Sequence, residues 1–156
     1  KKTRSLFDGM DVMESSESMT QREVKGYKVQ HAAGVESLWD DADARIIYAT
    51  LRSGQKIETD HSLVIFGDVN SGAEVVGGDI VVMGTLRGVA HAGAYDETGG
   101  GRMIFALNLR PTQLRIGTVI SRSASDVSQK APEIARVEDG IIIVETYSVK
   151  NLPRKI

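Results

Sequence analysis

Residues 63–66 read Leu-Val-Ile-Phe, and this short aliphatic stretch, followed by Gly67, decides the fold. Related stretches occur at residues 46–49 (Ile-Ile-Tyr-Ala) and 80–83 (Ile-Val-Val-Met), so the three begin at 46, 63 and 80, a constant step of 17 residues. β-Branched residues crowd these stretches and glycine follows within a few positions, which favours strands and turns over helices. Similar stretches at a fixed step predict a repeat architecture.

The length of the repeat predicts the shape of each unit. A step of 17 residues at about 3.3 Å each is a path of roughly 56 Å, which closes into a triangle whose sides are as long as ordinary strands. We therefore expect an all-β fold, a three-sided β-helix (solenoid) of a few coils with about 17 residues per coil. In this register Leu63 stacks above Ile46 and below Ile80.

The regular step ends after the third stretch. The next one, residues 103–106, begins 22 residues after Val81, so we expect about five added residues, placed in a protruding corner loop at Asp96 to Gly101. Beyond Leu109 the step is lost, but two further stretches still have the pattern of strands. They are Gln113-Leu114-Arg115-Ile116 and Ile141-Ile142-Ile143-Val144, the latter preceded by the turn Glu138-Asp139-Gly140.

Composition divides the chain near residue 46. Residues 1–45 contain nine acids and seven bases with little apolar periodicity, whereas all three prolines and 13 of the 16 glycines lie beyond. We expect residues 1–45 to be a linker with a remnant of an N-terminal domain at Leu6 to Met13, residues 46–149 to be the β domain, and residues 150–156 to be a tail. Because the chain opens with Lys1-Lys2 and not with methionine, we also expect a fragment.

Charge and residue usage exclude several classes of function. A net charge of −2 is too balanced to attract nucleic acid or an anionic membrane. The absence of cysteine excludes disulfides, thiol nucleophiles and thiolate metal sites. The longest apolar runs have about four residues, against the roughly 20 that cross a bilayer. We expect a cytoplasmic protein without a nucleic-acid partner.

No residue pattern predicts catalysis. The three histidines, His31, His61 and His91, do not have metal-ligand spacing. His91 with Asp96 and Glu97 could be drawn as an acid-base group, but solvated polar residues explain them better. We expect no catalytic residue, no metal and no cofactor, and hence no enzyme.

The four residues Arg52-Ser53-Gly54-Gln55 stand apart from the strand pattern. Arginine offers a planar fork for a carboxylate, serine and glutamine add hydrogen-bonding groups, and glycine permits a turn that presents them together. On these residues alone, a binding corner and a purely structural corner are equal alternatives.

Several motifs in order carry a resemblance to a known family. They are Arg52-Ser53-Gly54-Gln55, then Gly67 to Val75, then Gly84 to Gly88 with Ala92-Gly93-Ala94. Together they resemble the C-terminal domain of the septum site-determining MinC family. The resemblance runs from about Ile46 to Ile116 and resumes from Pro132 to Glu145.

This resemblance implies a right-handed β-helix domain that forms a homodimer and binds the ATP-bound form of the membrane-associated ATPase MinD. It also implies a cell-division regulator, cytoplasmic and recruited to the inner face of the membrane by MinD, that helps to place an inhibitor of FtsZ assembly at the poles. In the family FtsZ is contacted mainly through an N-terminal domain. The residues that match the MinD-binding motif are Arg52, Ser53, Gly54 and Gln55, and the additional surface expected beside them is Gly72, Glu74, Arg87 and Gly88.

Two other interpretations of the pattern remain. A bactofilin-like structural protein that polymerises end to end is the main alternative, although a filament former should repeat for more coils. A sugar-active β-helical enzyme is a weaker alternative, because the sequence lacks an evident pair of carboxylates across a cleft.

Overall fold

The computed structural model describes residues 41, 43–96, 101–122 and 131–153, which all fall within the unit Trp39–Ile156. These residues form strands and one short 3-10 helix, Val149–Asn151. The strands are β1 (Arg45–Ile47), β2 (Lys56–Glu58), β3 (Leu63–Ile65), β4 (Glu74–Gly77), β5 (Ile80–Leu86), β6 (Val89–Ala92), β7 (Met103–Leu109), β8 (Gln113–Ile116), β9 (Val119–Arg122), β10 (Glu133–Glu138) and β11 (Ile141–Thr146). Most of the expected linker, the remnant domain and residues 154–156 of the expected tail lie outside the described part, whereas Arg45, the last residue of that linker, begins β1.

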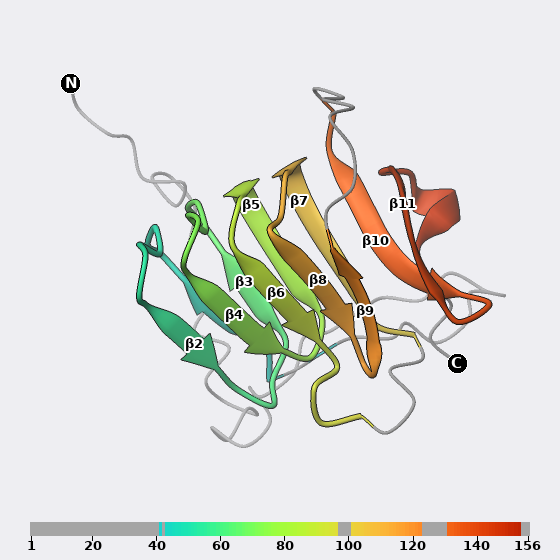
Figure 1. Ribbon diagram of the computed structural model, residues 1–156, viewed down its shortest axis with the longest axis horizontal. Coiled ribbons are helices and arrows are strands. Elements are labelled where there is room, and N and C mark those ends of the chain that lie inside the picture. The colour runs from blue at the N-terminus through green and yellow to red at the C-terminus, as the bar shows by residue number, and fades with distance from the viewer. Residues whose placement is uncertain (1–40, 42, 97–100, 123–130, 154–156) are drawn as a thin grey trace, which may run out of the picture. The chain divides into compact units, whose positions relative to one another are not determined.

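The strands form two sheets that face each other (Figure 1). The larger sheet has the order β1-β3-β5-β7-β10-β11, and the smaller sheet has the order β2-β4-β6-β8-β9. The chain alternates between them, so successive strands of one sheet pair in parallel from β1 to β7 and from β2 to β8. The last strands, β9, β10 and β11, pair antiparallel.

The expected three-sided β-helix is wrong. The described strands form two mixed sheets, and the remaining side of the molecule has no strand of its own. There the chain makes isolated parallel bridges, which link Leu51 to Val69 and Val69 to Leu86, and beyond them the ends of β5 and β7 pair, Leu86 with Leu109. The third side fails to form a sheet of its own because turns at residues 53–54 and 71–72 follow Leu51 and Val69 closely, so these two residues contribute single bridging positions.

The expected constant step is also wrong. Arg45 pairs with Leu63, Leu63 with Ile80, and Ile80 with Ile104, so the paired positions are 18, 17 and 24 residues apart. The stack of Leu63 on Ile80 is therefore confirmed. Ile46 does not lie under Leu63, because its side chain is 53% exposed and points away from the core.

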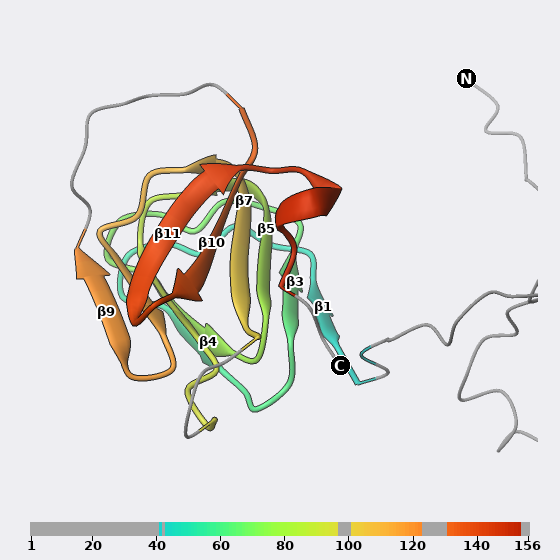
Figure 2. The ribbon, with the colours of Figure 1, turned by 90° about the vertical axis from the view of Figure 1, so that its right-hand side faces the viewer.

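Both sheets end in hairpins at the C-terminal end of the structure. β8 turns back as β9, and β10 turns back as β11 through Asp139 and Gly140, whose φ angles are 51° and 77°. Positive φ at both turn residues suits a two-residue hairpin loop, and Asp-Gly is a preferred sequence there. Figure 2 shows β10 and β11 in front of the other strands, at the end far from β1. This turn and the strands at residues 113–116 and 141–144 confirm the sequence prediction.

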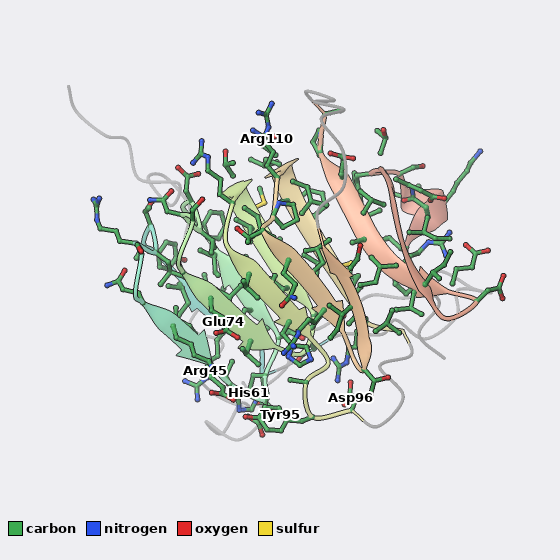
Figure 3. The ribbon with its side chains drawn as sticks, in the orientation of Figure 1. Arg45, His61, Glu74, Tyr95, Asp96 and Arg110 are labelled. Carbon is green, nitrogen blue, oxygen red and sulfur yellow. The ribbon has the colours of Figure 1, made fainter. Side chains whose placement is uncertain are left out.

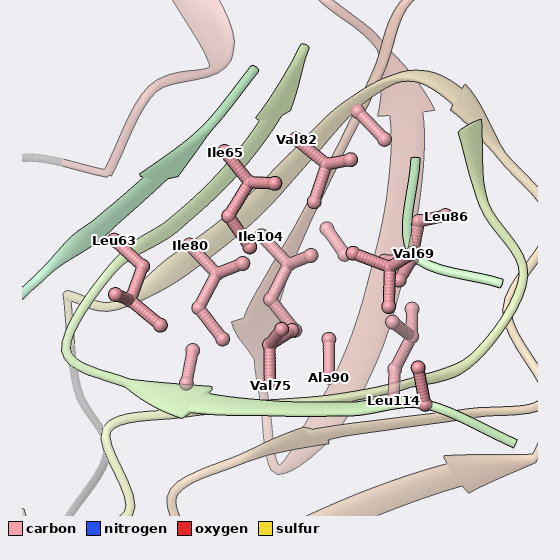
Figure 4. Close-up of a cluster of buried hydrophobic side chains, with 14 of the residues drawn as sticks. Leu63, Ile65, Val69, Val75, Ile80, Val82, Leu86, Ala90, Ile104 and Leu114 are labelled. Carbon is pink, nitrogen blue, oxygen red and sulfur yellow. The ribbon is translucent and has the colours of Figure 1, made fainter. Parts of the chain in front are cut away.

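The core lies between the two sheets (Figure 4). Inward side chains alternate with outward ones along each strand, as the pleat requires. Ten of these inward residues are fully or almost fully buried, and they come from both sheets and from the bridged corner. They are Leu63, Ile65, Ile80, Val82, Ile104, Val75, Ala90, Leu114, Val69 and Leu86.

Polar side chains bind backbone N–H groups where the chain turns between sheets. Thr85 N donates to Asp68 Oδ1 at 2.8 Å, and Asp79 N donates to Ser62 Oγ at 3.0 Å. Met103 N donates to Asp79 Oδ1 at 3.0 Å. A buried backbone N–H group without a hydrogen-bond partner costs free energy. These side-chain acceptors therefore stabilise the backbone at positions where no neighbouring strand supplies the acceptor.

Candidate partner-binding corner

Arg52 to Gln55 form an exposed turn between the bridging residue Leu51 and β2. Gln55 N donates to Arg52 O at 3.0 Å, and Gly54 has a φ angle of 86°. A positive φ at the third residue is that of a type II turn, where glycine is strongly preferred. The turn leaves the side chains of Arg52 and Ser53 exposed, as the sequence predicted for a corner.

Gln55 shapes this turn with its own side chain. Its Oε1 accepts a hydrogen bond from Arg52 N at 2.7 Å, so the two residues are joined both by backbone and by side chain. The amide nitrogen of Gln55 stays available as a donor on the exposed side. Gln55 therefore positions Arg52 as well as offering a polar group.

A second turn of the same kind packs against the first. Ala73 N donates to Asn70 O at 2.9 Å and Gly72 has a φ angle of 84°. The two turns are joined by Gly54 N, which donates to Gly72 O at 2.9 Å. A Cβ at Gly72 would lie 2.3 Å from Ser53 Oγ, so glycine at this position keeps room for the Ser53 hydroxyl.

The other residues of the expected additional surface differ in exposure. Arg87 is exposed, and Glu74 is half-buried with its carboxylate 4.0 Å from Lys56 Nζ. Gly88 is buried, and a Cβ there would lie 2.3 Å from Ala73 O. Gly88 therefore allows close backbone packing beneath the corner and does not itself present a contact group.

Two of the residues considered and set aside as an acid-base group, His91 and Asp96, make structural contacts. His91 Nε2 lies 3.0 Å from Gly117 O, while Asp96 forms an ion pair with Arg102, which also lies 3.9 Å from Asp79. The hydrogen bond from Arg102 to Asp96 raises the pKa of the guanidinium. Glu97 lies outside the described residues.

Within the described ranges, no group of three or more histidine or acidic residues is placed to hold a metal ion. The part of the chain that the structure describes also contains no helix with the length and apolar character of a membrane span.

A polar cluster lies on the outer face of the smaller sheet. Tyr95 donates its hydroxyl hydrogen bond to Glu58 Oε1 at 3.0 Å, and Lys56 Nζ lies 3.3 Å from the other oxygen of that carboxylate. The hydrogen bond from Tyr95 is the main cause that lowers the pKa of Glu58 below 4.5, and Lys56 lowers it further. The hydrogen bond to Glu58 raises the pKa of Tyr95 above 10.0. Figure 3 shows Tyr95 at the end of the sheets opposite Arg110.

Sequence reasoning did not identify the residues of an exposed apolar face on the larger sheet. Tyr48 and Phe66 stack with ring centroids 5.5 Å apart. Next along the sheet, Met83 and Leu107 are 37% and 40% exposed. We call these four residues the apolar face. Each directly follows an inward residue of β1, β3, β5 or β7. Strand alternation could therefore have located them in the sequence.

Comparisons with known proteins agree with the family resemblance of the sequence. A family model described as "Septum formation inhibitor MinC, C-terminal domain" matches residues 45–147. The chain is 48% identical over 110 residues to a probable septum site-determining protein MinC of Heliobacterium modesticaldum, covering 69% of this chain and 37% of that protein. It is 37% identical over 155 residues to the corresponding protein of a Sulfurihydrogenibium species, covering 89% and 75%.

A solved structure of a MinC:MinD cell division protein complex from Aquifex aeolicus is also similar. One of its chains matches with 40% sequence identity, a TM-score of 0.63, and coverage of 67% of this chain and 86% of that one. The chain thus spans between 37% and 75% of the length of the two curated relatives above. Because the family model covers most of the described residues, this chain belongs to the MinC septum formation inhibitor family.

Proposed function

We propose that this chain is a dimerising adaptor that binds ATP-loaded MinD through the corner Arg52 to Gln55. Through MinD it is recruited from the cytoplasm to the inner face of the membrane, where it helps to place an inhibitor of FtsZ assembly at the poles. The observation that carries the proposal is the exposed, preformed Arg52 turn in a chain of the MinC family. The similarity to a chain of a solved MinC:MinD complex supports MinD as the partner.

The geometry of the corner suits recognition of another protein. A turn held by backbone and side-chain hydrogen bonds loses little conformational entropy on binding, which favours affinity. Arg52 offers a guanidinium fork at a solvent-facing position, with the Ser53 hydroxyl and the Gln55 amide beside it. A surface of this kind can bind a partner protein through hydrogen bonds and charge, and binding of this kind requires no catalytic group.

The apolar face supports the dimer. Tyr48 is 78% exposed and Phe66 is 48% exposed, although their rings stack on each other. Contiguous exposed apolar side chains on one sheet face are typical of a protein interface. A second copy of the chain would bury this face in a symmetric contact, because a two-fold axis brings the same surface of both copies together.

The alternative of a filament is less well supported. A filament that grows by continuing the parallel sheets needs compatible parallel strands at both ends. Both sheets end in antiparallel strands, β9 and β11, so the described C-terminal end does not offer such a surface. The adaptor function agrees better with the arrangement of the strands.

The test is binding to purified MinD in the presence of ATP, with ADP as the nucleotide control. The parent chain is compared with Arg52→Ala and with Arg45→Ala, a matched change of an exposed arginine in β1. Loss of a charge-assisted contact of about 1.5 to 3 kcal/mol should weaken binding roughly 10- to 150-fold in Arg52→Ala alone. Equal binding by all three proteins, or no binding by the parent, would contradict the proposal.

A further inference from the structure

Four polar residues form a column along the bridged corner of the fold. Each directly follows an inward aliphatic residue of that corner, and the aliphatic residues pair with one another from one layer to the next. The column consists of Arg52, Asn70, Arg87 and Arg110.

Backbone hydrogen bonds fix the order of the column. Asn70 N donates to Leu51 O at 3.0 Å, Arg87 N donates to Val69 O at 2.7 Å, and Arg110 N donates to Leu86 O at 2.9 Å. Layers joined in this way are about 4.8 Å apart. Arg87 and Arg110 therefore occupy adjacent layers, and Arg52 lies two layers from Arg87.

Two of the arginines are oriented by neutral amides. Arg87 Nη1 donates to Asn70 Oδ1 at 3.4 Å, and Arg110 Nε donates to Asn108 Oδ1 at 3.2 Å. An amide oxygen orders the guanidinium without cancelling its charge. Both side chains are exposed, so their remaining donors face solvent.

The arginines of the column differ from Arg102 and Arg136, which are paired with acids. Arg102 pairs with Asp79 and Asp96, and Arg136 pairs with Glu138 and Glu145. Within the ranges that the structure describes, no carboxylate forms an ion pair with the arginines of the column. The column therefore presents three positive charges to an external ligand, and amide oxygens orient two of them, Arg87 and Arg110.

We propose that this arginine column binds an acidic segment of the partner protein, with Arg110 as a recognition residue beyond the Arg52 turn. The inference rests on the proposed function, since the column begins at Arg52. A guanidinium presents two parallel N–H donors to a carboxylate, so carboxylates spaced along a segment are the matching groups. Three arginines are fewer than the four to eight basic residues typical of lipid-binding clusters, which favours an acidic protein over a membrane.

The experiment measures binding of purified MinD with ATP to the parent chain, Arg52→Ala, Arg110→Glu and Arg45→Glu. Arg45→Glu is the matched control, because it makes the same charge change at the opposite end of the sheets (Figure 3). We expect Arg110→Glu to weaken binding roughly 10-fold or more. Arg45→Glu should bind like the parent, and added salt should weaken the parent more than Arg110→Glu. Thermal melting checks that each variant is folded.

The outcomes separate this inference from the proposed function. If Arg52→Ala loses binding to MinD while Arg110→Glu and Arg45→Glu both bind MinD as tightly as the parent, the proposed function stands and the arginine column is refuted. If the parent does not bind MinD, both are refuted. Vesicles of phosphatidylglycerol and phosphatidylethanolamine provide the last arm. If they bind the parent without MinD but not Arg110→Glu, the column contacts lipid and the acidic-protein inference is wrong.

Discussion

Gly72 lies directly against Ser53, because a Cβ on Gly72 would stand 2.3 Å from Ser53 Oγ and 3.0 Å from Ser53 Cβ. The two residues belong to successive turns of the corner, and the contact sets where the serine hydroxyl points. An alanine at this position would have to turn the hydroxyl away, whereas the turn itself could persist with a strained backbone.

We predict that Gly72→Ala weakens MinD binding while the domain stays folded. Gly140→Ala is the control, since Gly140 has a similar φ of 77° but nothing within 4 Å of its added Cβ. Both variants should lose about 1 to 2 kcal/mol of stability from the left-handed backbone. Only Gly72→Ala should bind MinD less tightly, as measured by titration alongside thermal melting. If both variants bind like the parent, the Ser53 hydroxyl has no part in recognition.

A second prediction concerns the core. Ile65 is completely buried between the sheets, so Ile65→Asp would place an unpaired carboxylate among aliphatic side chains. This should cost several kcal/mol of the roughly 5 to 15 kcal/mol that stabilise a domain. We expect loss of the cooperative melting transition in circular dichroism. Thr118→Asp, at an exposed position, should melt like the parent; an unchanged Ile65→Asp transition would show that the burial assigned to Ile65 is wrong.

The sequence predicts the strand positions better than their assembly. The aliphatic stretches at 63–66 and 80–83 predict the pairing of Leu63 with Ile80, because repeated spacing reflects stacking of like positions. The same spacing misplaces Ile46 by one residue, since turns absorb an extra residue without changing the strand pattern. The antiparallel return of β10 onto β7 has no local signal either, because Ile134 pairs with Phe105 across a long stretch of chain.

The candidate corner can be located from residue types and family motifs, but its internal contacts cannot. Arg52 and Gln55 belong to one four-residue motif whose chemistry is evident from the sequence. That Gln55 Oε1 binds Arg52 N depends on the turn geometry. Arg110 was missed because its place beside Arg87 follows from the pairing of Leu86 with Leu109, at a step of 23 residues that no repeat predicts.

A third prediction concerns pH. The Tyr95 hydroxyl is the main cause of the lowered pKa of Glu58, so Tyr95→Phe should raise that pKa toward its ordinary value of 4.5. A lowered carboxyl pKa favours the folded state above pH 4.5, and this contribution is lost as the pH falls through the folded-state pKa. The measurement is an NMR titration of the Glu58 carboxyl carbon. Tyr48→Phe, on the other sheet, should leave the titration unchanged, and an equal pKa in Tyr95→Phe would contradict the contact.

The last prediction is that Phe66→Asp converts the protein from a dimer into a folded monomer. Phe66 stacks on Tyr48 and lies between that ring and Met83 on the apolar face, where its side chain is 48% exposed. A carboxylate at this position remains hydrated in the monomer, so the fold should survive, unlike in Ile65→Asp. In a dimer the same carboxylate would be buried against an apolar partner surface without a counterion, which opposes association.

Light scattering at several micromolar concentrations measures this directly. We expect the parent to have twice the chain mass and Phe66→Asp to have the mass of one chain, with a similar far-UV spectrum. Ile141→Asp is the matched control, because Ile141 is 61% exposed in β11, the outer strand at the far end of the same sheet. It should remain dimeric. A contact centred on the apolar face should be disrupted by Phe66→Asp and not by Ile141→Asp. If Phe66→Asp remains a dimer, or if both variants dissociate equally, the second copy binds elsewhere on the protein.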